Sequence, residues 1–184
     1  MLEGGRHGEF ERLAMPLFDS LYNFARWLAQ DETEAEDLVQ EAYLKALNGF
    51  ASFEPGTDFR AWIFRILRNT FLTSRTGLRA KLTVPLEPEE EEMVAVTWET
   101  PESLALASVT RETIQAAIEQ LPIAYREVIL LCDAEEMKYQ EIAQILAVPI
   151  GTVMSRLSRG RKLLRQMLAG ERPHSSTPSV QVDE

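Results

Sequence analysis

The sequence contains a single cysteine, Cys132, and only two histidines, His7 and His174. One cysteine cannot form a disulfide within the chain, and so few thiol and imidazole groups disfavour both a zinc site and a cysteine–histidine catalytic pair. No nucleophile, base and orienting group recur at a usable spacing, so we expect no enzyme, no metal and no cofactor. Cys132 lies in the apolar run VILLC, which predicts a buried structural thiol.

Long apolar runs are also missing. No run approaches the roughly 18 residues that span a bilayer, and the N-terminal stretch MLEGGRHGEF lacks the apolar core of a signal peptide. We therefore expect a cytoplasmic protein without membrane insertion. With 184 residues and a hydrophobic content of 45%, the chain can bury one good core or two small ones.

Acidic residues are abundant, and the formal net charge is -10, yet two long segments contain none. Residues 59–86 hold six basic residues and residues 142–170 hold five, so the rest of the chain carries eight of the 19 basic residues and all 29 acidic ones. Net charge is a sum, whereas a polyanion responds to the local distribution. The overall acidity disfavours nonspecific nucleic-acid binding, but the acid-free segments indicate two basic surfaces.

Apolar residues recur at helical spacing along the chain, and no segment of any length alternates as a strand does. The clearest stripe covers residues 34–48, and Thr33 or Asp31 can cap that helix. Its other face carries Asp37, Gln40, Glu41 and Leu44. Further helices are expected over residues 103–120 and after Pro122. The pattern predicts an all-α fold.

A long helix is expected from residue 59 to residue 80, after a loop that Gly49, Pro55 and Gly56 indicate, with Asp58 as its N-cap. One sector of this helix is apolar, consisting of Phe59, Ile63, Ile66, Leu67, Thr70 and Phe71. The opposite side carries Arg65, Arg68, Arg75 and Arg79, flanked by Trp62 and Asn69. Solvated faces usually mix charges of both signs, so the absence of acids favours a binding surface over a solvated face.

Residues 138–147 form a short predicted helix, residues 148–150 a turn, and residues 151–168 a longer basic helix, which is the helix-turn-helix plan. In that plan the second helix presents its N-terminal part to base edges in the major groove. One side of it carries Thr152, Ser155, Arg156 and Arg159. Arg156 is the candidate for a bidentate guanine contact, whereas Arg159, Arg161, Lys162 and Arg165 are phosphate contacts or solvated charge. A hairpin with a solvated basic face is the alternative.

Between the two basic segments lies a proline-containing stretch with the acidic run EPEEEEM, which is typical of a linker. We therefore predict two small helical domains joined by a flexible acidic linker, the C-terminal domain being the helix-turn-helix. The predicted boundaries are 1–82, 83–104 for the linker, 105–170, and 171–184 for a disordered tail.

Four motifs occur in one order: AEDLVQEAYLKAL, FRAWIFRILRN, LPIAYREVILL and YQEIAQILAVPIGTVMSRLSRGRKLLR. In this order and spacing they resemble the extracytoplasmic-function (ECF) group of bacterial sigma factors in the sigma-70 family. The resemblance covers roughly Phe10 to Lys81 and Ser103 to Leu168. It implies a factor that directs core RNA polymerase to promoters and initiates transcription, with residues 1–82 as sigma region 2 and residues 105–170 as sigma region 4.

The resemblance also implies roles for particular residues. The face with Asp37, Gln40, Glu41 and Leu44 would dock on the clamp helices of the largest polymerase subunit, and the flap of the second subunit would be a further contact. The loop 51–58 and the next helix would capture a base flipped from the nontemplate minus-10 strand, which Arg60, Trp62, Arg65, Arg68, Asn69 and Arg75 would line. The helix-turn-helix would read the minus-35 element as duplex DNA. An anti-sigma factor is an implied partner, and a small-molecule substrate is not.

Some residues depart from the family pattern, and some interpretations stay open. Ala147 stands where Gly is frequent in the turn, Met154 where Lys is frequent, and Pro149 where a hydroxyl cap is common. Trp62 can stack on bases or pack in the core, and the acidic face of residues 34–48 can be merely solvated. Two other functions fit the motifs less closely: a conventional helix-turn-helix regulator, and a sigma-like adaptor that binds only protein.

Overall fold

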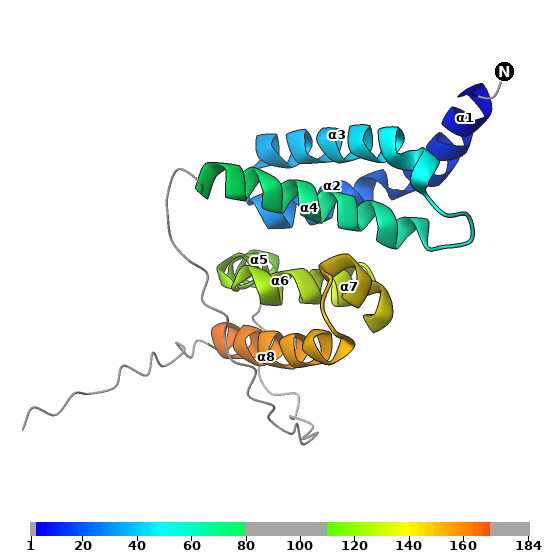
Figure 1. Ribbon diagram of the computed structural model, residues 1–184. Helices are drawn as coiled ribbons and strands as arrows, with labels where there is room; N and C mark the ends of the chain where they lie inside the picture. Colours follow the sequence, from blue (N-terminus) through cyan, green and yellow to red (C-terminus); the bar gives the residue numbers. More distant parts are fainter. Residues whose placement is uncertain (1–2, 80–109, 170–184) are drawn as a thin grey trace, which may run out of the picture.

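The computed structural model describes residues 3–79 and 110–169 (Figure 1). Every regular element in these two ranges is helical, which confirms the predicted all-α fold. The predicted linker and C-terminal tail lie outside the described residues, as does the first part of the helix expected over 103–120. No described helix is long and apolar enough to cross a membrane.

The N-terminal domain consists of helices joined by short turns. In chain order these are α1 (Glu3–Ala14), a 3-10 turn (Met15–Leu17), α2 (Phe18–Ala29), α3 (Glu32–Gly49), a second 3-10 turn (Phe50–Ser52) and α4 (Phe59–Arg79). Asp31 caps α3 by accepting the Glu34 N–H at 2.8 Å, and Asp58 accepts the Ala61 N–H at 3.1 Å at the start of α4. Both predicted capping sites are thus confirmed, with Asp31 rather than Thr33 at α3.

The core of this domain lies between α2, α3 and α4. The apolar sector predicted on α4 is buried almost throughout, and it packs on the apolar faces of the other two helices: Phe59, Ile63, Leu67, Thr70 and Phe71 on α4, Leu21, Phe24 and Leu28 on α2, and Leu38, Val39 and Ala42 on α3. At one end Phe10 from α1 meets Phe50 and Phe59 edge to face. This aromatic cluster fixes the loop that leads into α4.

The C-terminal domain begins, within the described residues, with α5 (Arg111–Gln120) capped by Thr110. It continues with α6 (Ile123–Ile129), a π-helical turn (Leu130–Ala134), α7 (Tyr139–Leu146) and α8 (Ile150–Leu168). Pro122 stands at the N-cap of α6, which is where the sequence predicts a new helix. Cys132 is only half-buried, although it packs against the core and its pKa is raised by burial.

Arg126 is the one buried arginine of the described chain. Its guanidinium donates to the carbonyls of Ile118, Glu119 and Leu121 at the end of α5. A fourth bond, 3.1 Å long, goes to the Trp27 carbonyl in the N-terminal domain. Burial lowers the pKa of Arg126 from its ordinary value. The side chain therefore satisfies the free carbonyls of α5 and ties the two domains together.

The two domains pack directly on each other. The main contact is between α4 and α7, and a smaller one joins α2 to α6. Figure 1 shows α6 and α7 between α4 on one side and α8 on the other. The sequence predicts two basic surfaces on separate domains, and the structure adds that one of them, on α4, lies partly in the domain interface.

Helices α6 and α8 approach each other closely at Gly160. A Cβ atom at this position would lie 2.9 Å from Ile129 Cδ1 and 3.1 Å from Tyr125 Cβ. We expect Gly160→Ala to lower the free energy of unfolding by about 1–2 kcal/mol, because overpacking costs about 1–3 kcal/mol and helix propensity returns about 1 kcal/mol. Urea denaturation followed by circular dichroism measures this difference.

Gly151→Ala, on the same helix, is the matched control because a Cβ there meets nothing within 4 Å. Its unfolding midpoint should equal or slightly exceed that of the parent chain. Equal midpoints for the two alanine variants would contradict the close approach at Gly160.

Candidate nucleic-acid interface

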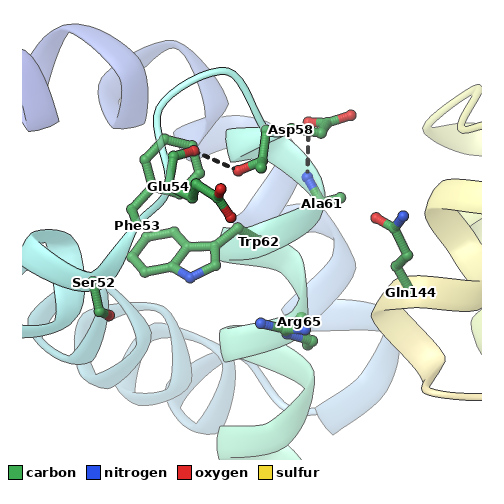
Figure 2. A pocket seen from close by; sticks show the side chains of 9 residues that line it. Ser52, Phe53, Glu54, Asp58, Ala61, Trp62, Arg65 and Gln144 are labelled. Carbon is green, nitrogen blue, oxygen red and sulfur yellow. Dashed lines mark hydrogen bonds between the residues drawn. The ribbon is translucent and has the colours of Figure 1, made fainter.

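A cavity of about 270 Å³ lies where the loop before α4 meets the start of that helix. Figure 2 shows the side chains that line it: Ser52, Phe53, Glu54, Thr57, Asp58, Ala61, Trp62 and Arg65 from the N-terminal domain and Gln144 from α7. Aromatic rings, carboxylates, hydroxyls and one guanidinium thus converge on a single hollow. The lip formed by Gln144 comes from the other domain.

Trp62 belongs to both the core and the cavity. Its ring centroid lies 5.3 Å from that of Phe53 and 5.5 Å from that of Phe59, and the residue is half-buried. The remaining surface of the ring lines the cavity. The two interpretations of Trp62 are therefore compatible, since packing against Phe53 holds the ring in place beside an open hollow.

The arginines on α4 find acidic partners that the local sequence does not contain. Arg68 Nε donates to Glu127 Oε1 at 2.9 Å and its Nη2 to Oε2 at 3.2 Å, and Arg60 Nη2 donates to Glu135 Oε2 at 2.6 Å. Both carboxylates belong to the C-terminal domain. Arg75 pairs with Glu34 at 3.2 Å and also reaches the Ala29 carbonyl.

Arg65 and Asn69 are exposed on the same helix, and Arg65 lines the cavity. The side chain of Arg79 lies outside the described residues. The predicted minus-10 set thus divides into Trp62, Arg65 and Asn69, which reach solvent or the cavity, and Arg60, Arg68 and Arg75, which are held by acids.

On the recognition helix α8 the exposed charges are Arg159, Lys162 and Arg165, with Arg156 and Ser155 half-buried beside them. Thr152 is only 8% exposed, so little of its surface faces outward. Arg161 turns back toward Asp133, with Nε 3.1 Å from Oδ2, and this contact raises the pKa of Arg161. The part of the predicted base-reading face that is open is therefore centred on Arg156 and Arg159.

The turn of the helix-turn-helix has the geometry that its sequence makes costly. Ala147 is left-handed, with φ 54° and ψ 44°, and its N–H bonds to the Ala143 carbonyl. Pro149 stands at the N-cap of α8 without a side-chain hydrogen bond, as its chemistry predicts.

The predicted docking face on α3 points outward. Asp37, Gln40 and Glu41 are exposed, and so is Leu44, whose side chain is 61% exposed. Glu41 forms an exposed ion pair with Lys45 at 2.7 Å.

Met15 and Phe18 form an exposed apolar surface that the sequence patterns did not predict. Met15 is exposed in the first 3-10 turn and Phe18 at the start of α2, and Phe18 contacts the rings of Tyr22 and Tyr43. Through Tyr43 this surface reaches α3, the helix that also carries Leu44. The sequence signal for it is weak: the run MPLF, in which three apolar residues flank Pro16.

The fold and these surfaces define a class: a two-domain helical DNA-binding protein with a helix-turn-helix. Comparison with known proteins is more specific. The family model "Sigma-70 region 2" matches residues 14–80, and "Sigma-70, region 4" matches residues 111–164. The chain is 35% identical to the ECF RNA polymerase sigma factor SigE of Mycolicibacterium smegmatis, covering 90% of this chain and 66% of that longer protein.

It is also 33% identical to the ECF RNA polymerase sigma factor EcfG of Rhodopseudomonas palustris, covering 84% of this chain and 88% of EcfG. Among solved structures, the sigma factor RpoE of Bartonella quintana, crystallised with the anti-sigma factor NepR, matches with a TM-score of 0.69 and 30% identity. That match covers 89% of this chain and 99% of RpoE. The chain therefore belongs to the ECF group of the sigma-70 family of RNA polymerase sigma factors.

The left-handed turn residue gives a direct test of the helix-turn-helix geometry. We expect Ala147→Gly to raise the free energy of unfolding by about 1 kcal/mol, because glycine adopts positive φ without steric cost. Ala143→Gly, in the helical part of α7, is the matched control and should lower it by about 1 kcal/mol. Thermal melts of the two variants should shift in opposite directions, and a shared direction would rule out the left-handed turn.

Proposed function

We propose that this chain directs core RNA polymerase to its promoters through three surfaces and catalyses nothing itself. One surface captures the opened minus-10 strand, one reads the minus-35 duplex, and one docks on the polymerase. The observation that carries this proposal is the cavity between the 51–58 loop and α4, where Trp62 and Arg65 lie together. An aromatic ring beside a cation is what single-stranded nucleic acid requires.

For the minus-10 strand, the cavity supplies stacking and reading groups in one place. Phe53 and Trp62 offer ring surfaces to an unstacked base, while Glu54, Asp58 and the hydroxyls of Ser52 and Thr57 offer hydrogen-bond partners for a base edge. Arg65 and Asn69 then face the backbone, and Arg60, Arg68 and Arg75 would extend the cationic track once they leave their acidic partners.

For the minus-35 duplex, α8 supplies an outward basic face without a carboxylate. Arg156 would contact a guanine, and Ser155 a neighbouring base edge or phosphate. Arg159 and Lys162 would contact phosphates on the flanks. Thr152 and Arg161 remain members of the predicted set, although the structure buries the first and pairs the second with Asp133.

For polymerase docking, α3 supplies an exposed leucine within a ring of polar groups. Leu44 would enter an apolar pocket of the clamp helices, and Asp37, Gln40 and Glu41 would surround that contact. This arrangement of an apolar anchor and polar rim is typical of protein interfaces. The likeness to RpoE supports an anti-sigma factor as a further partner, since that relative was crystallised with one.

Run-off transcription with purified core polymerase on a promoter library tests the whole proposal. We expect discrete promoter-dependent transcripts only when the chain and the core enzyme are both present. A filter-binding assay with duplex DNA separates the alternatives, because a conventional regulator binds duplex alone. A chain that binds polymerase but yields no transcript would instead be the adaptor.

The division of labour between α8 and α3 gives a matched pair of variants. We expect Arg156→Ala to weaken minus-35 recognition by about 5- to 150-fold, the equivalent of about 1–3 kcal/mol, while polymerase affinity is unchanged. Gln40→Ala should weaken polymerase affinity and leave minus-35 recognition by the assembled complex intact. Anisotropy with labelled core enzyme and filter binding of the assembled complex measure the two quantities. Equal loss of polymerase affinity in both variants would contradict the assignment.

A further inference from the structure

Beside its packing on α7, helix α4 contacts the C-terminal domain through two ion pairs of unequal burial. In the Arg68–Glu127 pair the arginine side chain is 14% exposed and the carboxylate 3% exposed, and two parallel hydrogen bonds join them. The Arg60–Glu135 pair is more open on the arginine side. Bidentate contacts of this kind fix orientation as well as charge. Together with the α4–α7 contact and the Arg126–Trp27 bond, the two pairs therefore help to set how the domains face each other.

The same guanidinium groups cannot hold these carboxylates and a DNA strand at once. Arg60 and Arg68 lie on the helix that carries Trp62 and Arg65, with Glu135 and Glu127 placed over them from the other domain. A carboxylate paired with a guanidinium occupies the position that a phosphate oxygen would take, since both are planar or tetrahedral oxyanions that accept two N–H bonds. We call the arrangement in which both ion pairs are formed the closed arrangement. In it, Glu127 and Glu135 compete with a DNA strand for the same guanidinium groups.

The closed arrangement is not optimal for its own polar groups. Arg60 Nε is buried and has no hydrogen-bond partner. A buried donor without an acceptor costs free energy that water would relieve if the domains separated. The unsatisfied Arg60 Nε therefore favours separation of the domains, whereas every guanidinium nitrogen of Arg126 has an acceptor in the closed arrangement.

The closed arrangement covers α4 but not the exposed face of α8. Helix α8 packs on α5, α6 and α7, on the other side of the C-terminal domain from α4 (Figure 1). Its exposed residues Arg159 and Lys162 face solvent in the same closed arrangement. The chain thus covers the surface proposed for single-stranded DNA and leaves the surface proposed for duplex DNA open.

We propose that Glu127 and Glu135 form an autoinhibitory latch, which holds α4 against the C-terminal domain in the free chain and must release before the minus-10 strand can bind. The latch rests on the proposed function only for the identity of the strand; closure itself is a property of the free protein. The apparent affinity for a single strand is reduced by the fraction of chains that are closed.

Removing the carboxylate charges tests the latch without touching the arginines that bind DNA. In Glu127→Gln/Glu135→Gln, Arg68 would be buried in the closed arrangement without a counter-charge, whereas both side chains are hydrated in the open one. Loss of one partner of a buried pair is strongly unfavourable, so the variant should open. We expect a larger radius of gyration by small-angle X-ray scattering and about tenfold tighter binding of a fluorescein-labelled single strand of mixed sequence.

Glu136→Gln is the matched control. Glu136 is exposed, lies next to Glu135 and belongs to none of the latch pairs, so its substitution changes the net charge in the same direction at a neighbouring position. Loss of this charge alone does not break a latch pair. The control should therefore leave the radius of gyration unchanged and the affinity for the single strand within about twofold of the parent chain. Thermal melts of all variants verify that each domain remains folded.

A charge swap separates closure from DNA contact. Arg68→Glu/Glu127→Arg keeps an ion pair with reversed polarity, so its radius of gyration should equal that of the parent chain and be smaller than that of the double glutamine variant. The single strand should bind it as weakly as it binds the parent chain.

The outcomes are distinguishable from those of the proposed function. An unchanged radius of gyration and unchanged affinity in the double glutamine variant would overturn the latch, even if run-off transcription succeeds. Expansion without tighter binding would also overturn it, because closure would then not control access to DNA. Expansion together with tighter binding supports it, and a failure of run-off transcription would then count against the proposed function alone.

Discussion

A guanidinium that leaves water must be given acceptors, because it stays charged at any pH that a protein meets. This constraint organises the described part of the chain more than any other. Arg126 is supplied with backbone carbonyls, Arg68 with both oxygens of a carboxylate, and Arg75 with one carboxylate and one carbonyl. Each of these arginines makes at least one contact with an element that is distant in the sequence, so they act as connectors within the described residues.

The two kinds of acceptor have different consequences. Carbonyls at a helix end are fixed by the helix itself, so three of the bonds of Arg126 stay within the α5–α6 unit. Only the bond to the Trp27 carbonyl has to break when the domains separate. A carboxylate can exchange its partner for water or another ion. The contacts through Glu127 and Glu135 are therefore the part of the domain interface that solvent or a competing anion can replace, and they lie on the helix proposed to bind the minus-10 strand.

Sequence patterns predicted what depends on neighbours in the chain. The apolar sector of α4 and the caps at Asp31 and Asp58 follow from helical spacing and single-residue chemistry, and the structure confirms them. The partners of Arg68 and Arg60 lie 59 and 75 positions away, so no local window contains them. An acid-free segment in one dimension is consequently not an acid-free surface in three. Thr152 illustrates the same limit, since its place beside Arg156 on a helical wheel does not show that the turn before α8 buries it.

Leu44 is exposed to solvent on α3, a long helix that is capped at its N-terminus and buried in the core on its opposite face. In the proposed docking, the backbone at Leu44 is therefore already ordered before the polymerase arrives. Association then pays little additional entropy at that position, and a modest contact area can yield a useful affinity. Rigidity of the scaffold, rather than size of the patch, is what such a surface contributes to the speed and economy of assembly.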